Sequence, residues 1–297
     1  MTTAPTSTAS PIFRFAPSPT GRLHLGHALS ALINRDMAHR ASGRLLIRIE
    51  DTDSTRCRPE YVQTILEDLA WLGIARDGPV LRQSEHLSDY RRAASRLEAM
   101  GLLYPCFATR QEIQAAAAPG VLDPDGAPLY PGLHRGLSAD EIAARKTAEE
   151  PFALRLDMAR AIELAHSIAG KAAFAYTEID EGFAAERRLT RPECWGDVVI
   201  QRKETATSYH LAVVVDDARQ HITHVVRGAD LRAATDIHRL LQVLMGLPEP
   251  VYHHHRLLTD ASGRKLAKRD GDTSLAALRE RGLTPSDIRR MVGLGPA

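Results

Sequence analysis

The segment from Pro17 to His27 carries the clearest candidate chemistry in this chain of 297 residues. Its letters, PSPTGRLHLGH, describe a turn with two prolines and a glycine that leads into a helix-forming stretch. His24 and His27 stand three residues apart, so both imidazoles fall on one face at the start of that helix. A helix N-terminus attracts anions, and imidazoles there can donate hydrogen bonds to phosphate oxygens as charge builds in a transition state. We therefore expect a phosphate-handling site rather than an ordinary helix start or a metal site, with Gly26 letting a flat group lie against the backbone.

Two further clusters could serve such a site. The segment 263–269, GRKLAKR, gathers Lys265, Lys268 and two arginines and can close over a polyphosphate. Taken alone, a basic cluster of this kind is more often a solvated surface loop. The segment 48–53, RIEDTD, places carboxylates after an apolar run, where they can bind an ammonium group or Mg²⁺ or cap the next helix.

Alternating apolar runs and helix-forming stretches must position these residues. Residues 12–15 and 45–49 predict strands and residues 23–41 predict a helix between them, which makes a βαβ unit of a parallel sheet. Further strands are expected at 198–201, 211–215 and 222–226, and further helices at 59–72, 88–100 and 231–245, with Ser88 and Asp230 as caps. Strand ends that carry polar residues and lead into helices describe an open α/β sheet with its ligand at the carboxyl edge.

The chain divides into five predicted parts. Residues 106–194 lose the regular pattern and hold many prolines and glycines, which indicates an insertion outside the central sheet. The two halves of the sheet domain are then residues 11–105 and 195–245. Residues 1–10 are expected to form a disordered tail, and residues 246–297 to hold the basic loop and a short C-terminal segment of helix and loop.

Composition narrows the class of protein. Lys and Arg total 38 against 37 for Asp and Glu, and the net charge of +1 excludes a nucleic-acid binder held by bulk charge while allowing a local patch. The cysteines, three in number and scattered, make no disulfide framework and fit a reducing cytoplasm. We expect a cytoplasmic protein without a membrane partner or signal peptide, and a monomer, because no coiled coil or long apolar helix is visible.

The motifs together resemble a known family. HLGH after APSPTG, with KLAKR far downstream, resembles the HIGH and KMSKS signatures of class I aminoacyl-tRNA synthetases, and RIEDTD, YHLAVVVDD and VVRGADL resemble their glutamyl branch. The resemblance covers residues 12 to about 275 and implies a Rossmann-like catalytic domain with an inserted α+β subdomain. Since only a short segment follows KLAKR, we expect no anticodon-binding domain, and the chain resembles the truncated paralogues, the glutamyl-Q tRNA(Asp) synthetases.

That resemblance implies a reaction in two steps. The enzyme would activate L-glutamate with ATP in the absence of tRNA and transfer it to the queuosine base at the wobble position of tRNA(Asp). The alternatives are a glutamyl-tRNA synthetase core that charges tRNA(Glu), a non-catalytic relative that binds tRNA or an amino acid, and a small nucleotidyltransferase acting on a cofactor precursor. Intact His24, His27, Lys265 and Lys268 argue against the binding relative, because a binding module needs no transition-state donors.

The resemblance also assigns roles to residues. His24, His27, Lys265 and Lys268 would be catalytic, and His24, Gly26, His27 and Lys268 would bind ATP with its Mg²⁺. The glutamate pocket would comprise Arg14, Phe15, Ala16, Pro17, Ser18, Glu50, Tyr209 and Arg227. Glu50 would accept the α-ammonium group, while Tyr209 and Arg227 would hold the side-chain carboxylate, Arg227 in a bidentate fork. Ala267 stands where the family usually has Ser, so we expect weaker loop closure at most.

Some members of the family hold zinc in the insertion. The matching positions here are Cys106, Ala108, Tyr130 and His134, and one thiolate, one imidazole and one phenol are not expected to make a closed tetrahedral zinc site. The run 253–255, HHH, also invites a metal hypothesis. On a strand, however, its side chains alternate between faces and cannot converge, so we expect an edge strand in which His254 supports the loop.

Overall fold

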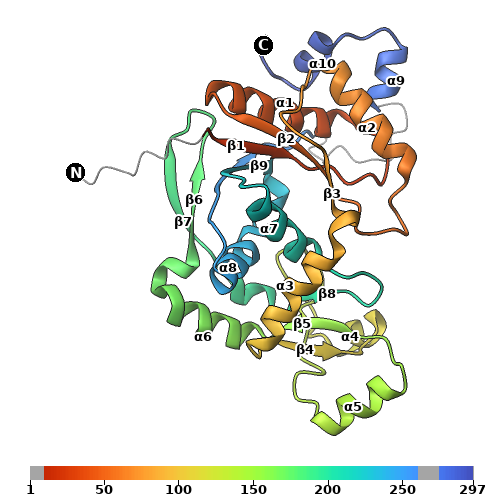
Figure 1. Ribbon diagram of the computed structural model, residues 1–297, viewed down its shortest axis with the longest axis vertical. Helices are drawn as coiled ribbons and strands as arrows, with labels where there is room; N and C mark the ends of the chain where they lie inside the picture. Colours follow the sequence, from red (N-terminus) through yellow and green to blue (C-terminus); the bar gives the residue numbers. More distant parts are fainter. Residues whose placement is uncertain (1–9, 260–273, 297) are drawn as a thin grey trace, which may run out of the picture.

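The computed structural model describes residues 10–259 and 274–296, and a seven-stranded sheet organises the larger part of it (Figure 1). The strand order is β3-β2-β1-β9-β10-β6-β7, and every neighbouring pair is parallel except β6 with β7. The strands are β1 (Ile12–Phe15), β2 (Arg44–Ile49), β3 (Leu81–Arg82), β6 (Ala175–Ile179), β7 (Ala185–Leu189), β9 (His224–Gly228) and β10 (Val251–His255). The prediction of an open α/β sheet with a βαβ unit at its start is confirmed.

Helices cover both faces of this sheet (Figure 1). On one side lie α1 (Leu25–Arg40), α2 (Pro59–Trp71), α9 (Leu275–Glu280) and α10 (Pro285–Met291), and on the other lie α3 (Leu87–Ala99), α6 (Met158–Ala169), α7 (Tyr209–Arg219) and α8 (Thr235–Met245). Strand β2 shows why both faces are apolar. Leu45 and Ile47 pack into the cluster around α1, whereas Leu46 belongs to a cluster that contains Val225 and Tyr252.

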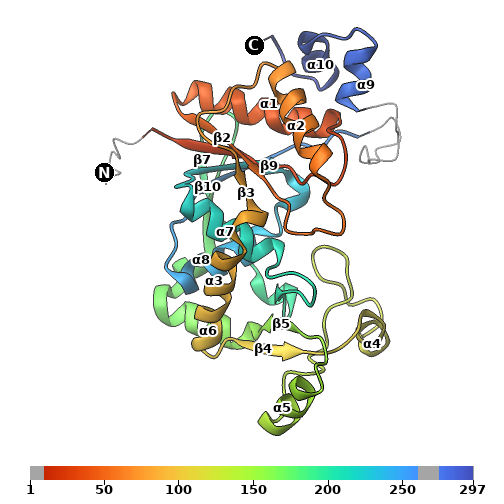
Figure 2. The same ribbon diagram turned by 45° about the vertical axis from the view of Figure 1, so that its right-hand side comes forward.

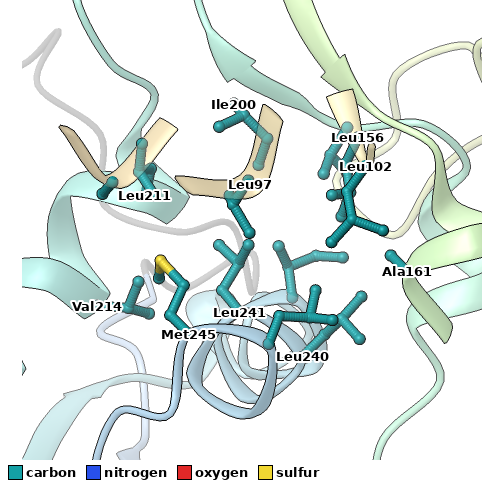
Figure 3. Close-up of a cluster of buried hydrophobic side chains, with 14 of the residues drawn as sticks. Leu97, Leu102, Leu156, Ala161, Ile200, Leu211, Val214, Leu240, Leu241 and Met245 are labelled. Carbon is teal, nitrogen blue, oxygen red and sulfur yellow. The ribbon is translucent and has the colours of Figure 1, made fainter. Parts of the chain in front are cut away.

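A second apolar core packs helices α3, α6, α7 and α8 against a smaller sheet (Figure 3). Leu97 of α3, Leu211 of α7 and Leu241 of α8 are completely buried there. Leu156 and Ile200 reach the same core from the small sheet, as Figure 3 shows. The start of α7 is therefore packed against the small sheet and against α3 and α8.

The small sheet is antiparallel, in the order β4-β5-β8, with β4 (Leu103–Cys106), β5 (Ala153–Leu156) and β8 (Val199–Gln201). Helices α4 (Arg110–Ala116) and α5 (Ala139–Thr147) lie at this end of the molecule (Figure 2). Short 3-10 turns complete the described elements: η1 (Gln83–His86), η2 (Gly170–Phe174), η3 (Pro192–Trp195) and η4 (Ala229–Leu231).

The prediction that all of 106–194 lies outside the central sheet is wrong. Strands β6 and β7 come from that stretch, and β6 pairs with β10. Their position has a physical reason, because β10 would otherwise present an unpaired edge of backbone donors and acceptors. The predicted edge strand at 253–255 is wrong for the same reason, since β10 lies between β9 and β6. The other predicted boundaries of the parts stay predictions.

The predicted strand at 211–215 is wrong, because these residues belong to α7. The Ser208 side chain caps the helix by accepting a hydrogen bond from the backbone N–H of Leu211 at 3.4 Å. The next three residues are buried as well. A helix that is buried all round shows no apolar stripe, so its run of valines has the appearance of a buried strand.

The two predicted helix caps, Ser88 and Asp230, are also wrong. Ser88 lies inside α3, and Asp230 lies in η4, ahead of the first residue of α8.

The C-terminal helix packs on the sheet domain. Arg289 of α10 donates to both carboxylate oxygens of Asp36 on α1 at 3.2 and 2.9 Å. Among the helices of the described residues, none has the length and apolar character that a membrane crossing needs. The cytoplasmic location and the monomeric state stay predictions.

Candidate active site

A cavity of about 660 Å³ opens at the carboxyl ends of β1, β9 and β10. From β1 the chain continues through α1 to β2 on one side, while β9 flanks β1 on the other, so the strand order changes direction at this point. Ligands of open α/β sheets bind at such a switch point, outside the carboxyl ends of the strands. The backbone N–H of Glu50 donates to Pro17 O at 3.0 Å and ties the ends of β2 and β1 together.

The structure brings most of the predicted site residues to this one cavity. Its lining includes Arg14, Phe15, Ala16, Pro17, Ser18, His24, Gly26, His27, Glu50, Tyr209 and Arg227. Lys265, Ala267 and Lys268 lie outside the described residues. The residues that flank that segment lie at the cavity, because Leu257 and Leu258 line it and Ser274 pairs with His24 in a β-bridge. The roles assigned to these residues stay predictions.

The two histidines of the HLGH motif cap α1 with their own rings. Nδ1 of His24 accepts a hydrogen bond from the backbone N–H of Gly26 at 3.0 Å, and Nδ1 of His27 accepts one from the backbone N–H of His24 at 3.2 Å. The ring centroids are 3.9 Å apart. Because each Nδ1 acts as an acceptor, the proton of each neutral ring is on Nε2. Both residues line the cavity, where their Nε2–H groups can serve as donors.

Gly26 is required by this cap. A Cβ at that position would lie 2.9 Å from Cε1 of His24, which is closer than a side chain can approach. Any larger residue would therefore push the His24 ring away from the helix N-terminus. The glycine of the motif thus preserves the orientation of an imidazole as well as space beside the backbone.

A buried network of charges forms one wall. Asp217 Oδ1 accepts hydrogen bonds from Nε of Arg14 at 3.1 Å and from Nη1 of Arg48 at 2.8 Å. Nη2 of Arg48 lies 3.5 Å from Oε1 of Glu50. Arg14 also donates to Val226 O at 3.4 Å, so its side chain is held by both α7 and β9.

The two carboxylates of this network differ in their proton affinity. Burial by itself would raise the pKa of Asp217, but the guanidinium groups of Arg14 and Arg48 outweigh it and lower that pKa. Burial raises the pKa of Glu50, and the positive charges of Arg48 and Arg14 offset only part of that effect. An ammonium group beside Glu50 would stabilise its ionised form, whereas Asp217 already has its counter-ions.

Arg227 lines the opposite wall and, unlike Arg14 and Arg48, is not paired with a carboxylate of the described residues. Its side chain is 5% exposed, and it forms no ion pair with a carboxylate of residues 10–259 or 274–296. Nε donates to His254 at 3.3 Å, Nη2 to Thr235 Oγ1 at 2.7 Å and Nη1 to Tyr209 OH at 3.4 Å, while Nη1 also lies 3.1 Å from Nδ1 of His238. Four of its five N–H groups thus have partners among the described residues. A bidentate fork on a substrate carboxylate therefore requires an exchange, and Tyr209, which lines the cavity, is placed to make it.

The histidines around Arg227 are neutral. Burial, followed by the charge of Arg227, lowers the pKa of His254 to about 2 and that of His210 to about 4, and it holds the pKa of His238 well below its usual value. Neutral rings orient the guanidinium without cancelling its charge. Buried charges are normally paired, and within residues 10–259 and 274–296 no carboxylate is paired with Arg227, so a bound anion would complete the pair.

The four positions matched to zinc ligands cluster away from this cavity, in the insertion. Sγ of Cys106 donates to Tyr130 OH at 3.3 Å, and Nδ1 of His134 accepts from the backbone N–H groups of Phe107 and Ala108 at 3.0 and 3.2 Å. Cys106, Ala108 and Tyr130 are buried in a small apolar cluster. Nδ1 of His134 is thus occupied by backbone N–H groups, and Tyr130 OH accepts both from Cys106 and from the backbone N–H of His134 at 3.0 Å.

Several residues of the site could not be identified from the sequence. Asp217, Thr235 and His238 support Arg14 and Arg227 from helices that the sequence pattern described as a strand or as ordinary amphipathic helix. Arg48 offered a usable signal, because a charged residue inside the apolar run LLIRI must be paired if the strand is buried. Thr20 and His255 also line the cavity; both lie in segments singled out above but were given no role there. Lining residues that carried no signal include Ser30, Arg56, Leu231 and Arg256.

Comparison with known proteins agrees with this geometry. The family described as tRNA synthetases class I (E and Q), catalytic domain, matches residues 12–295. A glutamyl-Q tRNA(Asp) synthetase of Rhodobacter capsulatus is 49% identical over 95% of this chain and 100% of its own length, and one of Nitratidesulfovibrio vulgaris is 37% identical over 93% and 83%.

A solved structure of a glutamate tRNA ligase from Elizabethkingia meningosepticum, in complex with its amino acid, superposes with a TM-score of 0.74 at 28% identity. The match covers 95% of this chain and 60% of that one. The fold, the motifs and the relatives agree, and the chain therefore belongs to the class I tRNA synthetases for glutamate and glutamine, a family of ligases, and within it to the glutamyl-Q tRNA(Asp) synthetases.

Proposed function

We propose that this protein activates L-glutamate with ATP and transfers it to the queuosine base at the wobble position of tRNA(Asp). The observation that carries the proposal is the charge pattern of the cavity. Arg227 offers a buried positive charge without a paired carboxylate among the described residues, and Glu50 offers a carboxylate, 11% exposed, that an ammonium group would stabilise. An α-amino acid with an acidic side chain supplies both complementary charges. Tyr209 lies beside Arg227, where it can hydrogen-bond the same side-chain carboxylate.

The N-terminus of α1 suits the phosphates of ATP. The Nε2–H groups of His24 and His27, whose Nδ1 atoms accept the first backbone N–H groups of the helix, border the cavity that holds Glu50 and Arg227. Leu231, Leu257 and Leu258 give the cavity an apolar side that fits a flat adenine ring. Mg²⁺ would take most of its ligands from phosphate oxygens and water and would neutralise charge on the leaving group.

Activation is a displacement at phosphorus. An oxygen of the glutamate α-carboxylate attacks the α-phosphorus and forms a new P–O bond, the bond to the bridging oxygen breaks, and pyrophosphate leaves with that electron pair. Charge builds on the phosphoryl oxygens during this step, and the donors of His24 and His27 can stabilise it. Lys265 and Lys268 would add two positive charges there.

Transfer then regenerates the site. A hydroxyl oxygen of the acceptor attacks the carbonyl carbon of glutamyl-adenylate, an ester bond forms, and AMP leaves with the electrons of the broken C–O bond. The hydroxyl proton passes to AMP or to water. The acceptor differs between the two candidate reactions, a queuosine hydroxyl here and a terminal ribose in a glutamyl-tRNA synthetase.

Glutamate-dependent exchange of labelled pyrophosphate into ATP tests the proposal. We expect exchange with L-glutamate in the absence of tRNA, little exchange with L-glutamine, and a loss of exchange in Arg227→Gln. Exchange that appears only after tRNA(Glu) is added would favour the synthetase core instead. No exchange under either condition would contradict both reactions and favour a binding protein.

A further inference from the structure

A line of side chains runs from Arg227 through β10 to β6. Nε of Arg227 donates to Nε2 of His254 on β10 at 3.3 Å, and Oγ1 of Thr235 lies 3.2 Å from the same nitrogen. At the other edge of the ring, Nδ1 of His254 lies 2.7 Å from Oε1 of Glu178 on β6. The side chains of His254 and Glu178 are 0% and 8% exposed. Arg227 is thus held by a buried histidine, and a buried carboxylate holds that histidine from behind.

The strand register places these groups together. Strand β6 forms a hairpin with β7 at one edge of the central sheet, and Glu178 pairs with Tyr252 on β10 (Figure 1). Tyr252 and His254 are two residues apart on their strand and so lie on one face of it. Their rings stack with centroids 6.0 Å apart, and the guanidinium of Arg227 lies over the Tyr252 ring. The hairpin therefore supplies a carboxylate to the wall that carries Arg227.

The two contacts of His254 determine where its proton lies. An arginine N–H can only donate, so Nε2 of His254 must present a lone pair to Arg227. An ionised carboxylate can only accept, so the proton of the neutral ring is on Nδ1 and is donated to Glu178. His24 and His27 have the opposite tautomer, because their Nδ1 atoms accept. Glu178 thus selects the one tautomer of His254 that can accept from Arg227.

Glu178 has counter-ions of its own. Oε1 lies 3.2 Å from Nη2 of Arg232, and Oε2 forms an ion pair with Nε of Arg188. Both arginine side chains are partly exposed, so Glu178 is balanced from the surface. Its carboxylate contacts His254 and does not pair with Arg227. The arrangement therefore orients Arg227 without cancelling its charge.

We propose that Glu178 is a positioning residue for amino-acid recognition, which fixes His254 so that Arg227 is held in the orientation that binds the side-chain carboxylate of glutamate. The inference rests on the proposed function, in which Arg227 binds that carboxylate. Glu178 and His254 do not line the cavity, so they act through Arg227. Without Glu178, the donors of Arg232 and His254 that converge on Oε1 would face each other. Moving the ring proton to Nε2 relieves that contact but sets two donors, Nε2–H and Nε–H of Arg227, against each other.

Two substitutions at Glu178 separate orientation from charge. Glu178→Ala removes the acceptor, whereas Glu178→Gln removes the charge but keeps a carbonyl oxygen, which the two donors at the Oε1 position favour there. Glu249→Ala is the matched control. That carboxylate also forms two ion pairs in this region, with Arg187 of β7 and Arg239 of α8, but it does not contact His254 or Arg227.

Pyrophosphate exchange gives the KM for glutamate, the KM for ATP and kcat of each variant. In metal sites, a carboxylate that orients a functional histidine contributes about 10–100-fold. We expect Glu178→Ala to raise the KM for glutamate about tenfold, with kcat and the KM for ATP within about threefold of wild type. Glu178→Gln and Glu249→Ala should keep the KM for glutamate within about threefold of wild type.

The ¹⁵N NMR spectrum of histidine-labelled protein gives the tautomer directly, with the His254 signals assigned by their loss in His254→Gln. We expect the Nδ1–H tautomer in wild type and Glu178→Gln, and the Nε2–H tautomer in Glu178→Ala.

Three results would overturn the proposal. These are an Nε2–H tautomer in wild type, a KM for glutamate in Glu178→Ala that matches wild type, and equal increases of that KM in Glu178→Ala and in either Glu178→Gln or Glu249→Ala. The last result would assign the effect to lost ion pairs. A wild-type protein without glutamate-dependent exchange would instead contradict the proposed function, and the tautomers alone would then decide whether Glu178 fixes His254.

Discussion

Replacing Asp217 by Asn should separate the role of charge from that of shape in the buried network. The substitution keeps the size of the side chain and one acceptor oxygen, but it removes the negative charge shared by Arg14 and Arg48, whose donors lie 3.1 and 2.8 Å away. Arg48 is completely buried, and its other carboxylate, Glu50, is 3.5 Å distant. Removing one partner of a buried ion pair costs about 3–5 kcal/mol. We expect the lower end of that range, because the hydrogen bonds can persist.

Urea unfolding and glutamate kinetics measure the result. A loss of about 3 kcal/mol corresponds to a decrease in Tm of about 5 °C for a chain of 297 residues. The KM for glutamate should also rise, since Arg14 lines the cavity and depends on Asp217 for its position. The neighbouring Asp216→Asn is the control: that carboxylate accepts from Gln83 and Tyr90, and about 1 kcal/mol is expected. Equal effects of the two substitutions, or a loss below 1 kcal/mol in Asp217→Asn, would refute the reasoning.

Three shorter predictions follow from the site, the histidines and the insertion. His27→Ala removes one donor and should lower the kcat of glutamate activation by about 10²–10³-fold in pyrophosphate exchange, and a loss under tenfold would argue against a role in the transition state. His254 stays neutral in the folded protein, where its pKa is about 2, but it becomes protonated in the unfolded chain as the pH falls below 6.5. Its contribution should therefore lower the free energy of unfolding by about 2 kcal/mol between pH 6.5 and pH 5. Urea titrations should show a smaller pH slope in His254→Gln and an unchanged one in His39→Gln, an exposed position. Incubation with EDTA should leave the Tm unchanged, because Cys106 is already hydrogen-bonded to Tyr130, and a lower Tm would indicate a structural metal.

The parts of the fold that the sequence predicted correctly are those with a local physical signal. The turn and glycine before α1, and the alternation of strand, helix and strand, follow from neighbouring residues. The errors arise where distant contacts decide. Val213 and Val214 belong to a helix that neighbouring helices and the small sheet bury, and β6 joins the central sheet because β10 offers it a partner.

The candidate site divides in the same way. Side chains within a motif, such as His24 and Glu50, could be named from their neighbours in the sequence. Those that act through a second residue could not, because His238 reaches Arg227 only across the fold at 3.1 Å. In the sequence, a histidine on an apolar helix face cannot be distinguished from an ordinary core residue, because its partner is unknown.

Among the described residues Arg227 has no paired carboxylate, so under the proposed function glutamate would be its structural counter-ion. A ligand that binds only the folded state adds about 2.7 kcal/mol to the free energy of unfolding at a concentration one hundred times its Kd. Glutamate in this cavity would therefore make local opening rarer, in addition to being consumed by the reaction. Proteases act on the opened form, so the supply of free glutamate would set the lifetime of this protein as well as its rate of turnover.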